Sequence, residues 1–156
     1  MTQWSDGKMR CFWANPKNPR YIQYHDEEWG RPVHEDRKLF EMLLLETFQA
    51  GLSWECVLNK REGFRLAFDG FDPETIAGYT EEKLEALRQD PAIIRNRLKI
   101  RAAATNARVF LAIRREWGTF DRYLWHRTEG KTLRETGLAH SPLSDAISKD
   151  LKKRGM

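Results

Sequence analysis

The sequence predicts an all-α fold of about seven short helices packed into one compact bundle. Apolar residues recur at helical spacing, helix-capping residues recur between these segments, and no segment alternates apolar and polar residues convincingly. A chain of 156 residues is long enough to bury a core without disulfide or metal staples. We therefore expect residues 1–156 to form a single domain.

Residues 1–35 are expected to form an irregular, aromatic-rich loop. Chain-breaking residues follow one another closely there, at Asn15-Pro16, Asn18-Pro19, Gly30 and Pro32. The same segment contains these aromatic residues: Trp4, Phe12, Trp13, Tyr21, Tyr24 and Trp29. A loop with so many aromatic side chains is expected to pack onto the body of the protein rather than to be disordered.

Helical patterning begins at Asp36. Asp36 is the expected N-cap, and Gly51 the expected residue after the C-terminus, of a helix over 37–50. Capping residues then predict the remaining helices in order. These are 54–68, 73–78, a helix starting after Thr80, a short turn of helix opened by Asp90-Pro91, 97–116, 120–126 and 143–154.

Composition and charge exclude several classes of protein. The 27 Lys and Arg residues exceed the 23 Asp and Glu residues by four, which permits a polyanionic partner without requiring one. Purely apolar runs such as Met42–Leu45 are far too short to span a bilayer. The N-terminus lacks the apolar stretch of a secretory signal. With two cysteines and no disulfide scaffold, we expect reduced thiols, a cytoplasmic location and no membrane partner.

Glu46, within the helix over 37–50, is the first candidate for chemistry. It shares a helix face with apolar residues, and more apolar residues line the adjoining face. These residues are Leu39, Met42, Leu43 and Ala50, then Phe40, Leu44 and Phe48. A helix that is apolar nearly all round should be buried, so Glu46 is expected in surroundings that disfavour its charge. The alternative is a structural ion pair with one of the many Arg and Lys residues.

Aromatic residues are candidate walls of a pocket around this carboxylate. Tyr24, Trp29 and Trp54, with Trp13 upstream, would suit a flat, hydrogen-bonding and cationic ligand such as a nucleobase. The alternative is that these side chains belong to the core, where most aromatic residues are found.

Two further patterns have a possible chemical meaning. Cys11 and His25 supply the thiolate and imidazole that zinc prefers, although two ligands at a loose spacing are weak evidence. Between Pro91 and Arg115 there are seven basic residues and no acidic one, and a second basic cluster ends the chain. That cluster is Lys149, Lys152, Lys153 and Arg154. Such charge favours binding to a phosphate backbone, and the alternative is a solvated helix face.

Taken together, the motifs resemble the type I 3-methyladenine DNA glycosylase family. The pairing of HDxEWG with LExxQAGLSW is the most specific part of a resemblance that covers nearly the whole chain. It rests on RCFW (10–13), YHDEEWG (24–30), KLFEMLLLETFQAGLSWECVLNKRE (38–62), FDPETIA (71–77), IIRNRLKI with TNAR (93–108) and SDAISKDLKKRG (144–155). The resemblance implies a helix-hairpin-helix fold and an enzyme of base-excision repair. Such an enzyme flips 3-methyladenine out of double-stranded DNA and hydrolyses its N-glycosidic bond, leaving an abasic site.

The resemblance also implies the roles of individual residues. Glu46 would be the catalytic carboxylate that hydrogen-bonds the base, while Tyr24, Trp54 and Trp13 would line it. Gly51 and Leu52 lie where the family probes the gap left in the duplex. Lys149, Lys152, Lys153 and Arg154 would contact the DNA backbone. Water is the implied nucleophile, no organic cofactor is expected, and we expect a monomer.

Cys11 and His25 match two of the four zinc ligands of the family. The other two, a His and a Cys, follow LKKRG in family members, and this sequence ends at Met156. We therefore expect half of a structural zinc site and an incomplete C-terminal hairpin, since His126 and His140 do not match the remaining positions. Two other functions stay open: a non-enzymatic relative that binds bases or DNA without excision, and a basic interaction domain.

Overall fold

The computed structural model describes residues 1–134 and 139–156, and within these ranges it confirms the predicted all-α fold. The helices are α1 (Pro19–Glu27), α2 (Asp36–Gln49), α3 (Trp54–Asn59), α4 (Arg61–Ala67), α5 (Pro73–Ala77), α6 (Glu81–Gln89), α7 (Arg97–Trp117), α8 (Phe120–Trp125) and α9 (Pro142–Lys153). Single 3₁₀ turns follow α4 and α8, at Asp69–Phe71 and His126–Thr128. Over the described ranges, no helix is long and apolar enough to cross a membrane.

Helix α1 lies in the segment that we expected to be irregular. The Asn18 side chain accepts hydrogen bonds from the backbone N–H groups of Arg20 and Tyr21, and Pro19 occupies the first helical turn. An Asn-Pro pair is therefore a helix start here, since proline needs no hydrogen-bond partner at that position. Before α1, strands β1 (Thr2–Gln3) and β2 (Met9–Arg10) pair antiparallel in a short hairpin.

The expected helix over 54–68 is two helices in the structure. The backbone of Lys60, at φ −99° and ψ 1°, separates α3 from α4. This division and the addition of α1 raise the number of described helices from about seven to nine. The residues after Asp90 form a turn rather than a helix, in which the Asp90 carboxylate accepts from the Ala92 N–H at 2.8 Å.

Asp36 is not the N-cap of α2, as we expected. Glu35 takes that position without a side-chain hydrogen bond, and Asp36 is the first helical residue. The Asp36 carboxylate instead accepts hydrogen bonds from the backbone N–H groups of Phe120 (3.0 Å) and Asp121 (2.9 Å). It therefore satisfies two free donors at the N-terminus of α8 and ties the start of α2 to that helix.

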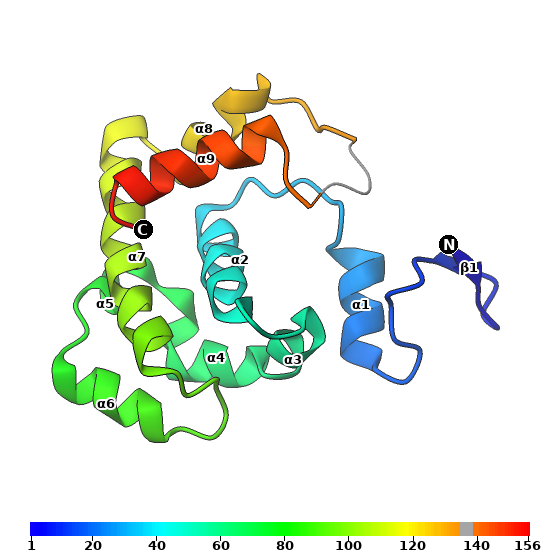
Figure 1. Cartoon of the computed structure of the whole chain (residues 1–156), viewed down its shortest axis with the longest axis horizontal. Coiled ribbons are helices and arrows are strands. Elements are labelled where there is room, and N and C mark those ends of the chain that lie inside the picture. The colour runs from blue at the N-terminus through cyan, green and yellow to red at the C-terminus, as the bar shows by residue number, and fades with distance from the viewer. Residues whose placement is uncertain (135–138) are drawn as a thin grey trace.

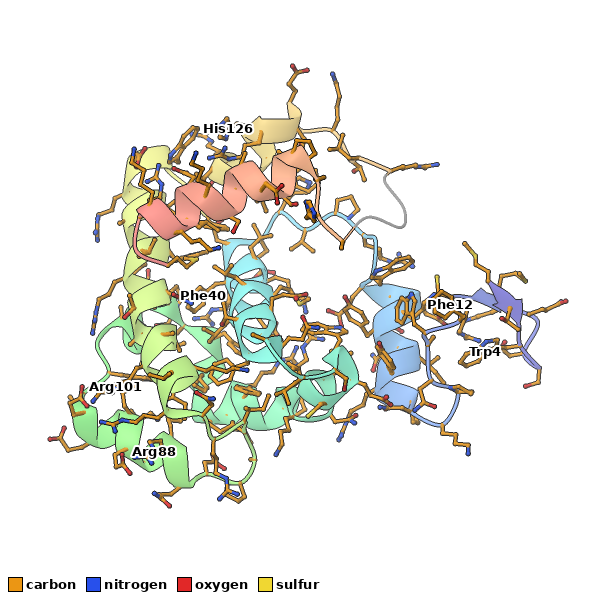
Figure 2. The ribbon with its side chains drawn as sticks, viewed as in Figure 1. Trp4, Phe12, Phe40, Arg88, Arg101 and His126 are labelled. Carbon is orange, nitrogen blue, oxygen red and sulfur yellow. The ribbon has the colours of Figure 1, made fainter. Side chains whose placement is uncertain are left out.

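The core is built around α2, near the middle of the molecule, and α7 beside it (Figure 1), with further buried residues from α4, α5, α6 and α8. Phe40 points from α2 toward α7, where its ring centroid lies 4.8 Å from that of Phe110 (Figure 2). Phe110 also stacks on Phe120 at 4.4 Å, and all three rings are buried. Fully burying a phenylalanine contributes about 1.5–3 kcal/mol, so this stack joins α2, α7 and α8 firmly.

Helices α1 and α9 flank this core on different sides. Helix α1 packs against α3, on the side of α2 away from α7 (Figure 1). Helix α9 is anchored by Asp150, whose carboxylate accepts from the hydroxyl of buried Tyr123 at 2.8 Å and pairs with Arg127 and Arg154. Helix α1, which carries aromatic side chains, and helix α9, which carries basic side chains, are thus both held against the rest of the fold.

Candidate functional site

Helix α2 carries two glutamates with opposite environments. Glu41 is 6% exposed, and its Oε1 lies 2.7 Å from Arg61 Nε and 2.9 Å from Arg65 Nη2. Burial alone would raise the pKa of Glu41, but the hydrogen bond and charge of Arg61, with Lys38 and Arg65, lower it. The structural ion pair that was the alternative for Glu46 therefore exists at Glu41 instead.

Glu46 is exposed, so the expectation that it would be buried is wrong. It makes no hydrogen bond or ion pair to any residue that the structure describes. Neighbouring atoms nonetheless desolvate the carboxylate enough to raise its pKa. An unpaired carboxylate with a raised pKa is free to accept a hydrogen bond from a ligand.

Helical periodicity did not predict the exposure of Glu46, because only one of the two apolar faces of α2 is fully buried. The other face, which holds Leu39, Met42 and Glu46, is partly open. Leu39 and Met42 line an apolar cavity of about 480 Å³, together with residues of the 30–33 segment, α8 and α9. Glu46 does not line that cavity.

Tyr24 and Trp54 contact each other, and the charge of Glu46 acts on Tyr24. Their ring centroids are 5.5 Å apart in an edge-on arrangement, because α1 packs against α3. Burial, followed by the negative charge of Glu46, raises the pKa of Tyr24 to about 12, so the phenol is neutral.

The indole of Trp54 leaves a donor free. Its Nε1 is buried and makes no hydrogen bond of good geometry to the residues described, although it lies near enough to the Tyr24 hydroxyl to lower the pKa of that group slightly. Nearly all buried N–H groups are satisfied in folded proteins, so an unsatisfied one indicates where a ligand or water atom binds. Glu46, Tyr24 and Trp54 therefore combine a free acceptor, a neutral phenol and a free donor on three helices. We call these three residues the carboxylate–aromatic site.

Trp13 and Trp29, which lie before and after α1, form an aromatic cluster with residues of that helix. Trp13 packs against Tyr21 at 5.3 Å, His25 at 5.1 Å and Trp29 at 5.2 Å. Trp29 stacks on His25 and is 48% exposed. The sequence grouped both tryptophans with Tyr24 and Trp54, whereas in the structure their aromatic contacts are with Tyr21, with His25 and with each other. The role of Trp13 in base binding stays a prediction.

A tight turn joins α2 to α3 at Gly51 and Leu52. Ala50 adopts φ −47° and ψ 117°, Gly51 adopts φ +79°, and the Leu52 N–H donates to the Gln49 carbonyl at 2.7 Å. These values define a type II β-turn, which favours glycine at its third position. Leu52 is 39% exposed on this turn. The probing role that the family resemblance implies for Gly51 and Leu52 stays a prediction.

Several basic side chains between Pro91 and Arg115 have protein partners, which the composition of the segment did not indicate. Arg101 pairs with Glu81, Arg114 pairs with Glu74 at 2.7 Å, and Arg108 donates to the Ala77 carbonyl at 2.9 Å. Figure 2 shows Arg101 on α7 at its boundary with α6. Helices α5 and α6 thus supply acidic and carbonyl partners that lie far away in sequence.

The C-terminal basic cluster divides into two parts. Lys149, Lys152 and Lys153 are exposed on α9 and form no ion pair within residues 1–134 and 139–156. Arg154 instead pairs with Glu116 at 2.6 Å and with Asp150 at 3.1 Å, and these hydrogen bonds raise its pKa. Arg154 therefore holds α9 against α7, and the prediction of a DNA-backbone contact rests on the three lysines.

Cys11 and His25 lie together but do not form a closed zinc site. The Cys11 backbone N–H donates to His25 Nε2 at 3.1 Å, and His25 Nδ1 lies 2.9 Å from the Asp26 carboxylate. Arg10 binds that carboxylate through two nitrogens. In the described part of the chain, no group of three or more His, Cys, Asp or Glu residues could hold a metal ion. Two donors do not fit a tetrahedral structural site.

The fold and the carboxylate–aromatic site define an all-α protein that presents an unpaired carboxylate and a pair of aromatic side chains on neighbouring helices. The chain belongs to the methyladenine glycosylase family, since residues 13–156 match the sequence pattern of that family.

Relatives of known structure and function support this assignment. The chain is 47% identical over 153 residues to DNA-3-methyladenine glycosylase 1 of Escherichia coli (strain K12). The aligned region covers 94% of this chain and 81% of that protein. A crystal structure of 3-methyladenine DNA glycosylase I superposes with a TM-score of 0.88 at 45% identity, over 95% of this chain and 84% of the other. A tyrosine-to-phenylalanine variant of a 3-methyladenine DNA glycosylase I, crystallised in complex with 3-methyladenine, gives a TM-score of 0.85 at 34% identity. That likeness covers 90% of this chain and 78% of the other.

Proposed function

We propose that this chain is a DNA-3-methyladenine glycosylase, which removes the methylated base from alkylated double-stranded DNA and leaves an abasic site. The observation that carries the proposal is the carboxylate–aromatic site in a chain that is 47% identical to a named glycosylase. A membrane partner is not part of the proposal. A monomeric enzyme in the cytoplasm, where Cys11 and Cys56 stay as free thiols, agrees with these features.

The proposed reaction requires the protein mainly to position the methylated base. Methylation at N3 gives the adenine a positive charge, so the base leaves readily. Water attacks C1′ of the sugar, the C1′–N9 bond breaks, and its electron pair neutralises the departing base. The proton released by the water passes to solvent. No lysine is needed for this hydrolysis, because no covalent intermediate with the enzyme forms.

Each member of the carboxylate–aromatic site has a role in this proposal. The Glu46 carboxylate accepts a hydrogen bond from the exocyclic amino group of the flipped base, which presents a donor beside ring acceptors. Tyr24 and Trp54 form the aromatic wall, and the free Trp54 N–H can donate to a ring acceptor. The exposed Lys149, Lys152 and Lys153 of α9, the first helix of the proposed helix-hairpin-helix, contact the backbone phosphates.

The test is the release of free base from a duplex treated with a methylating agent. The purified chain should release 3-methyladenine and leave an undamaged duplex intact. Binding to methylated DNA or to free 3-methyladenine without any release would instead support the non-enzymatic relative. The absence of both binding and release would favour the basic interaction domain.

Binding of free 3-methyladenine should weaken as the pH falls. The carboxylate must be ionised to accept the hydrogen bond, and desolvation raises the pKa of Glu46 above its ordinary value of 4.5. Affinity is therefore full above that raised pKa and is lost as the pH falls through it. Titrations followed by tryptophan fluorescence measure this, with Glu46→Gln as the control. Protonation of 3-methyladenine itself affects both proteins equally, so only the titration of Glu46 should make their pH profiles differ. Equal pH profiles for both proteins would show that Glu46 does not contact the base.

We further propose that this chain holds zinc weakly or not at all, with Cys11 as a free thiol near His25. Two ligands cannot close a tetrahedral site, so metal should dissociate during dialysis against a mild chelator. Metal analysis of the dialysed protein is expected to find far less than one zinc per chain. One zinc retained per chain would contradict this proposal and would require ligands beyond Cys11 and His25.

A further inference from the structure

We propose that Lys99 is a positioning residue for excision, which holds the turn at Gly51 and Leu52 in the conformation that meets DNA. Lys99 lies on α7, about fifty residues from the turn in sequence, and its Nζ donates to the Phe48 carbonyl at 2.9 Å and to the Ala50 carbonyl. The proposal rests on the proposed function, because it assigns Lys99 to the probing of the duplex.

The two carbonyls that Lys99 binds control the geometry of the turn. The Phe48 carbonyl is one of the last acceptors of α2, which have no partner within the helix. The Ala50 carbonyl belongs to the central peptide of the type II turn between Gln49 and Leu52. Conversion to a type I turn would flip that peptide and turn its carbonyl away from Lys99. The ammonium group therefore selects one of two available turn conformations.

Lys99 is itself fixed by the first turn of α7. Its backbone N–H donates to the side chain of Asn96 at 3.1 Å, which caps the helix, and the next residue, Ile100, is 1% exposed. A cation near the C-terminus of α2 also interacts favourably with the helix dipole. Lys99 thus connects the turn to the buried part of α7. It therefore acts at this position as a structural cation rather than as a phosphate contact.

Gly51 offers an independent way to disturb the same turn. It adopts φ +79°, and a Cβ built at this position would meet no atom within 4 Å. Gly51→Ala is therefore a change in backbone preference rather than a steric clash. If Lys99 acts through the turn, Lys99→Met and Gly51→Ala should have overlapping effects that do not add in the double variant.

The experiment compares Lys99→Met and Lys99→Arg with a matched control, Lys60→Met. Lys60 Nζ also donates to a backbone carbonyl, that of Pro91 at 2.8 Å, which is not part of the turn. Single-turnover excision at saturating enzyme should fall about tenfold in Lys99→Met, as expected for losing a hydrogen bond to a charged group. Lys99→Arg should retain most of the activity that Lys99→Met loses, and Lys60→Met should excise the base at the wild-type rate.

Two further readouts separate a positioning role from the alternatives. The affinity for free 3-methyladenine and the salt dependence of DNA binding should both stay unchanged in Lys99→Met. If Lys99 contacted a phosphate, the log–log salt slope would instead drop by about 0.9, and saturating enzyme would restore full excision. That outcome would overturn the proposal, as would an equal loss of base affinity or full activity in Lys99→Met.

The backbone amide resonances of Gly51 and Leu52 test the contact without any reaction. They should shift in Lys99→Met and stay in place in Lys60→Met, and unchanged resonances in Lys99→Met would overturn the proposal. If the unchanged protein excises no 3-methyladenine, the proposed function fails while these resonances still decide whether Lys99 holds the turn. Lys99→Arg, which keeps the charge, provides the same comparison if Lys99→Met does not fold.

Discussion

Glu46→Gln lowers the single-turnover rate of 3-methyladenine excision by about ten- to a hundredfold, the effect of losing one hydrogen bond to a charged group, about 1.5–3 kcal/mol. The amide keeps the size of the side chain but replaces the charged acceptor by a neutral one. Because Glu46 has no partner among the described residues, the change removes no contact that holds the fold. Stability should therefore stay nearly constant while excision falls.

Glu41→Gln is the matched control, on the same helix and five positions earlier. Glu41 is buried in ion pairs with Arg61 and Arg65, so its neutralisation should lower the free energy of unfolding. Excision by the remaining folded protein should stay close to normal. Chemical denaturation and single-turnover kinetics of both variants measure this contrast. Excision at the normal rate by Glu46→Gln would remove Glu46 from the reaction.

Arg61→Met should be the most destabilising single change considered, by about 3–5 kcal/mol, because it removes the shared partner of a buried ion network. Arg61 is 8% exposed and binds Glu41 through Nε at 2.7 Å and Glu28 through Nη1 at 2.7 Å. Methionine fills part of the volume but leaves both carboxylates without this donor. Urea denaturation near neutral pH provides the measurement.

The pH dependence of stability gives an independent check on this network. Burial alone would raise the pKa of Glu28, but hydrogen bonds from Arg61 and Lys38 lower it to about 2. A lowered carboxyl pKa means that the stabilisation is complete above the ordinary value of 4.5 and is lost as the pH falls toward 2. Arg61→Met should flatten this acid-sensitive part of the stability curve. An unchanged curve, or a loss below about 1 kcal/mol, would show that the network is not buried as described.

Local signals in the sequence were enough to predict most of the fold. The cap Thr80 and the proline after Asp72 mark helix starts that the structure reproduces. These signals act within one turn of helix, so no distant contact is needed to interpret them. Helix α1 was missed although Asn18-Pro19 is a signal of the same kind, because closely spaced breakers were taken as evidence for a loop.

The candidate site was predictable in its residues but not in its environment. The motifs identified Glu46, Tyr24 and Trp54, which the structure places together. Which glutamate of α2 is buried depends on Arg61, a residue on another helix, and helical periodicity cannot show such a partner. For the same reason the basic segment seemed free in sequence, although Arg114 pairs with Glu74 across two helices.

The most direct test of the central claim is the response of the tryptophan indole N–H resonances to added 3-methyladenine. The Trp54 indole should shift, because its buried Nε1 has no partner and lies beside Tyr24 near Glu46. The Trp125 indole, which lines the 480 Å³ apolar cavity and donates to the Val33 carbonyl, should stay in place. A shift of the Trp125 resonance with an unchanged Trp54 resonance would place the base in that cavity and contradict the carboxylate–aromatic site.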